Sequence, residues 1–188
     1  MSEHIEAVVT DGEELSELLQ VRHDKLNALI EEGNNPFEQT VYERTAYAKQ
    51  ILEDFEAFED KTVRLAGRIM SHRDMGKASF MDLADSSERI QLYLRSDELG
   101  ESYEGLKKWD IGDIIGIEGV VFKTRRGEVS VRPSSVTLLA KSLRPLPEKF
   151  HGLKDTDLRY RQRYLDLTMN PEVRETFVKR TQIIRGYL

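Results

Sequence analysis

Cysteine is the most informative absence in this sequence of 188 residues, because it does not occur at all. Disulfide bonds, thiolate catalysis and cysteine zinc sites are therefore excluded, and a cytoplasmic location is the default expectation. No apolar run approaches the roughly 20 residues that a membrane helix needs, so we expect no membrane as a partner. The acidic first residues lack the basic and apolar regions of a secretory signal, and we expect none.

The sequence also lacks the patterns of a self-contained active site. Its histidines are scattered and show no metal-ligand spacing, so we predict no metal site. The glycines of DIGDIIGIEG fall inside an expected strand, not in a phosphate-binding loop. No set of Ser, His and Asp has a favoured spacing. We therefore expect no catalytic residue in this chain and no cofactor of its own. The four histidines are His4, His23, His72 and His151.

Charge is unevenly distributed along the chain. Residues 1–60 hold 16 acidic and 4 basic residues, whereas the net charge of the whole chain is only -6. The remainder is consequently basic, and such a body could accept a polyanion at a local patch. A merely solvated, charged surface is an equal alternative at this point.

Two helices are predicted in residues 1–60, which we define as an N-terminal helical extension. Apolar residues recur at helical spacing over residues 13–32, and Asp11 with Glu14 resembles a capping box. A second apolar stripe predicts a helix over residues 41–58.

From residue 62 the apolar period changes to two, which is typical of half-buried strands. A helix is expected between the third and fourth strands, and this order is the layout of an OB-fold, a small partly open barrel. The predicted fold class is therefore mainly β with helices (α+β), with the barrel over residues 61–141. An unclosed five-stranded sheet of another α+β fold is the alternative. The expected strands cover residues 62–71, 76–84, 89–95, 113–124 and 128–132.

Beyond the barrel, two prolines make residues 142–147 a stiff connector, and we define residues 142–156 as a linker. Asn170 followed by Pro171 is a strong helix start. The helix that follows runs to the last residue with an apolar stripe and no stop signal. We expect either a truncated chain or a partner that covers this stripe.

A phenylalanine on the solvent side of the second expected strand is the main functional signal. Alternation buries Met81 and Leu83, and it therefore turns Phe80 outward. If the strands pair about the turn at residues 85–88, Phe80 lies across from Tyr93 and diagonal to Gln91. Other outward or nearby polar residues are Arg68, Asp82 and, in the turn between the first two strands, Arg73 and Lys77.

This combination is typical of a surface that binds single-stranded bases, which stack on aromatic side chains for about 1–3 kcal/mol per base. Gln91 would read a base edge, Arg68 lies close by, and Glu128, beside Arg125 and Arg126, could accept from a base amino or imino group. The alternative is that the aromatic pair only stabilises the sheet, by roughly 0.2–1 kcal/mol.

Four stretches resemble one family, the bacterial-type class II lysyl-tRNA synthetases: GRIMSHRDMGKASFMDLAD, RIQLYL, KKWDIGDIIGIEGVVFKTRRGEVSV and LLAKSLRPLPEKFHGLKDTDLRYRQRYLDL. The resemblance is to the N-terminal half of these enzymes and runs from about residue 15 to the end. The barrel pattern is shared with the aspartyl and asparaginyl enzymes, whereas LRPLPEKFHGL followed by RYRQRYLDL is more specific to the lysine enzymes.

The resemblance implies an anticodon-binding OB-fold, a linker and, in residues 157–188, the first helices of a truncated class II catalytic domain. It implies that the central uridine of the lysine anticodon stacks on Phe80, that Gln91 reads its edge, and that Arg73 and Glu128 contact the anticodon. His72 stands where the family often has Arg. Further candidates for contacts to the tRNA, the basic residues near these positions and on the first helix, are Lys77, Lys123, Arg125, Arg126, Arg22 and Lys25.

The resemblance also implies what this chain should not do alone. The parent enzymes join lysine to tRNA(Lys) through a lysyl-adenylate, with ATP and Mg²⁺, and their class II motifs cannot be matched within 188 residues. We therefore expect this chain to bind the tRNA(Lys) anticodon stem-loop without aminoacylating it, and we expect a homodimer for the parent enzyme and no DNA partner. Two alternatives remain: a short RNA-binding protein that regulates or assists, and a protein-interaction piece whose barrel does not bind RNA.

Overall fold

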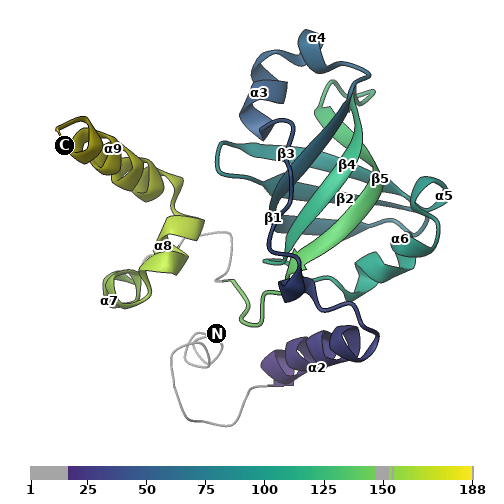
Figure 1. Ribbon diagram of the computed structural model, residues 1–188, viewed down its shortest axis with the longest axis horizontal. Coiled ribbons are helices and arrows are strands. Elements are labelled where there is room, and N and C mark those ends of the chain that lie inside the picture. The colour runs from purple at the N-terminus through teal and green to yellow at the C-terminus, as the bar shows by residue number, and fades with distance from the viewer. Residues whose placement is uncertain (1–16, 147–152, 154, 188) are drawn as a thin grey trace. The chain divides into compact units, whose positions relative to one another are not determined.

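The computed structural model describes residues 17–146, 153 and 155–187, and the chain divides into two compact units. One unit is Gly12–Pro145 and holds a β-barrel (Figure 1). The other comprises Met1–Asp11 and Leu146–Leu188 and holds the helices α7, α8 and α9.

The barrel consists of five strands whose order in the closed sheet is β1-β2-β3-β5-β4. All neighbours are antiparallel except β3 and β5, which run parallel. Three short helices lie between β3 and β4, where we predicted one helix. The predicted OB-fold is confirmed, and the unclosed sheet is excluded because the five strands form a closed barrel. The elements are β1 (Thr62–Asp74), β2 (Ala78–Ala84), β3 (Arg89–Arg95), α5 (Ser96–Leu99), α6 (Glu101–Gly105), η2 (Leu106–Lys108), β4 (Ile114–Lys123) and β5 (Val129–Ala140).

The barrel interior is filled by the alternate residues that the sequence pattern turns inward. Helix α3 (Ala48–Glu53) adds Ile51 to this core, and the segment between β3 and β4 adds Tyr103 and Leu106. The largest fully buried strand residues are Leu65, Ile69, Met81, Leu83, Leu92, Leu94, Ile115, Ile117, Val121 and Val131.

The hairpin of β2 and β3 has the predicted register, with Phe80 opposite Tyr93. Its turn is closed by the side chain of Asp85, which accepts hydrogen bonds from the backbone amides of Ser87 and Glu88. Its other carboxylate oxygen accepts from the amide of Ala48 at the start of α3. Burial alone would raise the pKa of Asp85, but a hydrogen bond from the Ser87 hydroxyl, together with those from the backbone amides, outweighs it and holds the pKa below its usual value.

The predicted helix over residues 41–58 is wrong in its first half. Only α3 and α4 (Phe55–Phe58) are helical there, preceded by the short 3₁₀ helix η1 (Pro36–Glu38). Between η1 and α3, tertiary contacts override the local pattern, because the amide of Thr45 donates to the carbonyl of Arg64 on β1 and the Arg64 amide donates to Thr45 Oγ1. Residues 39–47, which we call the crossing segment, therefore cross the outside of the barrel in extended form.

Two strands are longer than predicted. Strand β1 continues to Asp74, so that Arg73 lies on a strand and not in the turn where we expected it. A register shift between Ile69 and Ser71 marks a β-bulge within β1. Strand β5 continues to Ala140, well beyond residue 132, and pairs along the whole of β4.

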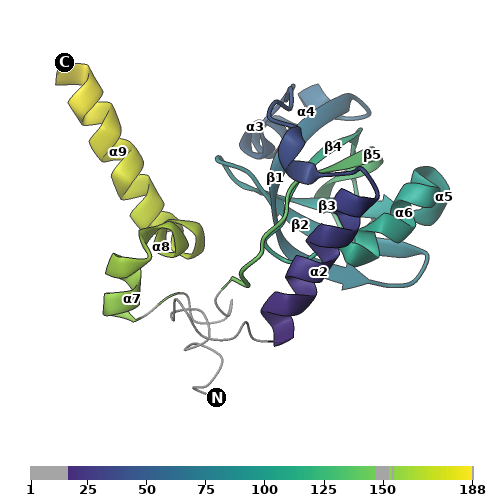
Figure 2. The ribbon, with the colours of Figure 1, turned by 60° about the horizontal axis from the view of Figure 1, so that its bottom comes forward.

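Helix α2 (Glu17–Glu31) packs on the barrel end formed by the loop before β4 (Figure 1, Figure 2). Lys25 pairs with Asp110 at 2.7 Å, and the fully buried Lys141 bonds both Asp110 and Asp113. These pairs satisfy charges that burial would otherwise make costly. The predicted capping box at Asp11 and Glu14 lies outside the described residues.

The second unit contains α7 (Thr156–Arg161), α8 (Arg163–Met169) and α9 (Pro171–Tyr187). The buried carboxylate of Asp166 accepts hydrogen bonds from Arg159, Arg163 and Asn170, which ties α7 to α8 and to the start of α9. Helix α9 has no buried residue, and several of its large apolar side chains are exposed: Phe177, Val178, Ile183, Ile184 and Tyr187.

Candidate nucleic-acid interface

A row of side chains crosses the outer face of β1, β2 and β3. Arg73, Phe80 and Tyr93 are direct register partners on these three strands. The Phe80 and Tyr93 rings have centroids 4.9 Å apart and planes inclined by 30°. Phe80 is partly exposed, and Arg73 is exposed. The row therefore offers an aromatic surface with a guanidinium group beside it.

The bulge in β1 is what brings Arg73 into this row. Before it, Ile69 is buried and Arg68 faces outward. After it, Arg73 pairs with the outward-facing Phe80, and His72 pairs with the buried Met81. Strict alternation from Arg68 would have placed His72 on the outer face instead. One inserted residue thus exchanges a histidine for an arginine next to the aromatic pair.

A second, polar row lies two residues away from the first along the same strands. It joins Ser71, Asp82, Gln91 and Ser130 across β1, β2, β3 and β5. The hydroxyl of Ser71 donates to Asp82, and the hydroxyl of Ser130 donates to Gln91 Oε1 at 3.0 Å. Gln91 itself is only half buried. Its amide therefore lies next to the aromatic row with one side anchored to the sheet.

Two residues that we did not predict extend the aromatic row onto β4 and β5. The rings of Tyr93 and Phe122 have centroids 6.1 Å apart, and the Arg132 guanidinium lies 5.8 Å from the centre of the Phe122 ring. Arg132 also pairs with Glu98 at 3.3 Å. Their signal was present in the sequence, since each follows a buried valine in an alternating strand, Val121 or Val131.

The barrel and the chain as a whole are similar to known proteins. The model of a family described as OB-fold nucleic acid binding domain matches residues 63–139. The lysine–tRNA ligase of Thermoanaerobacter pseudethanolicus is 53% identical over 187 residues, which is 99% of this chain and 38% of that protein. The enzyme of the same name from Carboxydothermus hydrogenoformans is 56% identical over 93% of this chain, and that from Clostridium tetani 50% identical over 98%. This chain is a homologue of the lysine–tRNA ligases.

The chain spans less than two fifths of the length of these ligases, 38%, 36% and 37% of the three named. The resemblance to the lysine enzymes and the anticodon-binding OB-fold that it implied are confirmed. Of the residues that the resemblance singled out, the structure brings Phe80, Gln91 and Arg73 together on one outer face. Glu128 is exposed at the β4–β5 hairpin, where the Thr124 amide donates to the Glu128 carbonyl and the Glu128 amide donates to Thr124 Oγ1.

The other basic candidates in this ligase homologue fall into two groups. Lys77, Arg125 and Arg126 are exposed in turns, and Lys123 lies 4.6 Å from the centre of the Phe55 ring, so its ammonium group already has an aromatic partner. These residues remain accessible to a polyanion.

Three predicted contacts are instead parts of the packing. The buried Arg22 donates to the carbonyls of Ser142 and Ile111, and Lys25 is paired with Asp110. Arg68 donates to the carbonyl of Gly112 at 2.6 Å, and burial lowers its pKa. Because each of these three side chains already has a hydrogen-bond or ion-pair partner within the barrel unit, we do not carry them into the proposed RNA contacts.

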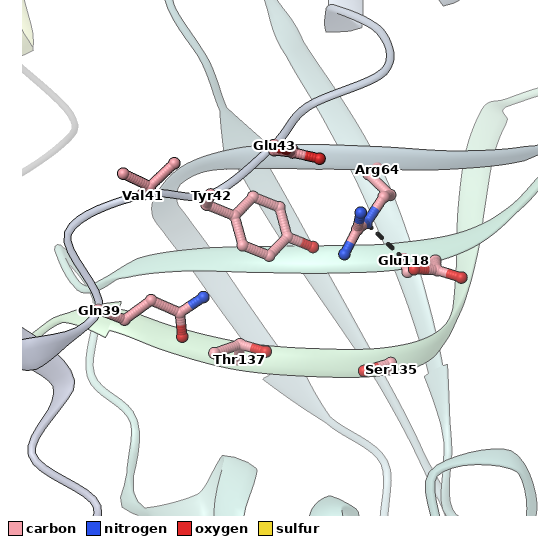
Figure 3. Close-up of a pocket in the computed structure, with 8 residues that line it drawn as sticks. All are labelled: Gln39, Val41, Tyr42, Glu43, Arg64, Glu118, Ser135 and Thr137. Atoms are coloured by element: carbon pink, nitrogen blue, oxygen red, sulfur yellow. Dashed lines mark ion pairs between the residues drawn. The ribbon is translucent and has the colours of Figure 1, made fainter.

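A separate cavity of about 340 Å³ lies on the outside of β1, β4 and β5, beneath the crossing segment (Figure 3). Its central charges neutralise each other, since Arg64 pairs with Glu118 at 3.1 Å. The Tyr42 ring lies 5.6 Å from the same guanidinium, and burial raises the pKa of the Tyr42 phenol. Arg64 and Glu118 therefore add no net charge to the cavity, which Glu43 also lines.

Among the described residues, no group of three or more His, Asp or Glu side chains is placed to hold a metal ion. Among the helices of residues 17–146 and 155–187, none is long and apolar enough to cross a membrane.

Proposed function

We propose that the outer face of β1, β2 and β3 binds the anticodon loop of a lysine tRNA. The observation that carries the proposal is the partly exposed Phe80 with Arg73 and Gln91 on either side, in a homologue of the lysine–tRNA ligases. An exposed aromatic plate, an edge-reading amide and a cation are the three elements with which proteins bind unpaired RNA bases.

The roles follow from the placement of each group. The central uridine stacks on Phe80 and is held at its edge by Gln91. Arg73, for which no described residue supplies an ion-pair partner, contacts the same nucleotide or its phosphate. Glu128 accepts from a neighbouring base. The exposed basic side chains Lys77, Arg125 and Arg126, with Lys123 in part, contact the phosphates, which makes the affinity fall with salt.

We further propose that the whole protein is a lysine–tRNA ligase of the cytoplasm that uses ATP and Mg²⁺. In that protein the exposed apolar side chains of α9 would be covered by a second subunit. The chain described here has no residue that we assign to ATP, Mg²⁺ or lysine. We therefore expect it to bind tRNA without charging it.

The test is a titration of the 188-residue chain with a labelled anticodon stem-loop that carries UUU, at stated salt. Phe80→Ala should weaken binding roughly 5- to 150-fold, because stacking contributes about 1–3 kcal/mol per base. The matched control is Phe37→Ala, which removes an exposed phenylalanine of η1 outside this face. Equal binding by wild type and Phe80→Ala would overturn the proposal. Absence of RNA binding together with dimerisation through α9 would favour the protein-interaction alternative.

A further inference from the structure

The hydroxyl of Ser130 has an unusual position for a strand residue on an outer face. It is completely buried, at 0% exposure, between β3 and β5. A buried hydroxyl must find a hydrogen-bond acceptor or lose free energy. Gln91 Oε1 lies at 3.0 Å, whereas the alternative acceptor, the Glu128 carbonyl, is at 3.5 Å, the outer limit of a hydrogen bond. The Ser130 proton is therefore directed at the Gln91 amide oxygen.

This contact removes a freedom that a glutamine side chain ordinarily has. The amide carries an acceptor on one side and two donors on the other, and a rotation of 180° about its last bond exchanges them. If the amide rotated, Nε2 would donate to Ser130 Oγ, and the buried hydroxyl proton would exchange its acceptor at 3.0 Å for the Glu128 carbonyl at 3.5 Å. One orientation of Gln91 is thus favoured before any RNA binds.

The orientation of this amide decides which pyrimidine it fits. Uracil presents the O4 acceptor beside the N3–H donor, and cytosine presents the N4 amino donor beside the N3 acceptor. An amide held with Nε2 at the position of O4 and Oε1 at the position of N3–H pairs with uracil. Opposite cytosine, the same amide places donor against donor and acceptor against acceptor. A freely rotating amide would accept either base.

We infer that Ser130 is a positioning residue that holds the Gln91 amide in the uracil-reading orientation and so excludes cytosine. This inference rests on the proposed function, because it assumes that Gln91 faces the central base of the anticodon. It adds a residue that would not touch the RNA. The second lone pair of Oε1 stays available to the base while Ser130 occupies the first.

The experiment compares UUU and UCU stem-loops on the wild type and on Ser130→Ala. The wild type should prefer UUU by about tenfold or more, since a good bidentate pair contributes on the order of 1–3 kcal/mol. In Ser130→Ala the amide can rotate, so the preference should fall to about threefold or less. The loss should come chiefly from tighter binding of UCU. A general structural defect would weaken both RNAs and could not strengthen one.

A second pair of variants separates the hydroxyl from the packing. Ser130→Thr and Ser130→Val have the same shape, but only threonine keeps the donor. The threonine variant should retain the preference for UUU, and the valine variant should lose it. If both keep the wild-type ratio, or both lose it equally, Ser130 does not orient Gln91 and the inference is wrong.

The two proposals fail in different ways. If UUU binding depends on Phe80 but the ratio of the two affinities is unchanged in Ser130→Ala, only the role of Ser130 is overturned. If the wild type binds UUU and UCU equally while Phe80→Ala still weakens binding, the face binds the loop without reading the central base, and the roles of Gln91 and Ser130 fall together. If Phe80→Ala has no effect, the proposed function itself is overturned.

Discussion

The barrel has two outer faces that each carry an aromatic residue and an arginine, but the contacts of these residues with the rest of the chain differ. On the face of β1, β4 and β5, Tyr42 lies over Gly116, and Arg64 is paired with Glu118 (Figure 3). On the face of β1, β2 and β3, Phe80 is partly exposed and no carboxylate among the described residues pairs with Arg73. The arginine therefore has an ion-pair partner on the first face, whereas the arginine of the second face has none among the described residues. This difference points to the second face as the one that takes a ligand.

On the face of β1, β4 and β5, Tyr42 covers Gly116, and we call this the covered face. A larger side chain at Gly116 should have the largest effect on stability. A Cβ at Gly116 would lie 2.5 Å from the Tyr42 ring, so Gly116→Ala must displace that ring and should lower the free energy of unfolding by about 1–3 kcal/mol. Gly105→Ala on α6 is the matched control, since nothing lies within 4 Å of its added Cβ. Denaturant unfolding measures both. An unchanged Gly116→Ala protein would show that the cover is loose.

Removal of the two arginines should separate the faces by function. Arg73→Ala should weaken UUU stem-loop binding by roughly 5- to 10-fold, an effect of about 1 kcal/mol, and reduce its salt dependence by about one phosphate contact. Its unfolding free energy should stay within about 0.5 kcal/mol of wild type, as for an ordinary surface change. Arg64→Ala should leave RNA binding unchanged. A larger loss of RNA affinity in Arg64→Ala than in Arg73→Ala would reverse the assignment of the faces.

The smallest expected effect concerns His72, which the bulge turns inward beside Arg73. Burial lowers the pKa of His72 below 6.5, and nearby Asp74 only partly restores it. The unfolded chain therefore binds a proton more readily, and the contribution of His72 to stability is lost as the pH falls from 6.5 through the lower, folded-state value. Stability at pH 5.5 relative to pH 7.5 should fall less in His72→Gln than in wild type. Equal pH dependence in the two proteins would contradict a partly buried His72 whose pKa is lowered in the folded protein.

The arrangement on the face of β1, β2 and β3 could largely be predicted from the sequence, because its signals are local. Alternation and the turn at Asp85 sufficed to place Phe80 opposite Tyr93 with Gln91 diagonal to them. The position of Arg73 was not readable, since the bulge in β1 shifts the alternation without leaving a mark in the pattern. The role of Ser130 depends on the parallel pairing of β3 with β5, which joins residues 39 positions apart.

The covered face was not readable for the same reason. No local pattern near residue 45 predicts its hydrogen bonds to Arg64. Apolar residues at helical spacing just beyond it favoured a helix, which is the wrong structure there. Arg22 and Lys25 resembled free basic residues of an exposed helix, but their partners lie 85 to 120 positions away. From charge alone, a basic residue that packs against the barrel cannot be distinguished from one that is available to RNA.

The most direct test of the two-face account is to map the RNA on the protein by NMR. Backbone amide shifts of the ¹⁵N-labelled chain would be followed as the UUU stem-loop is added. The account predicts that the largest changes gather at residues 73, 80, 91 and 93, with little change over residues 39–43 and at Thr137. Changes concentrated on the covered face, with the amides of Phe80 and Gln91 unmoved, would contradict it.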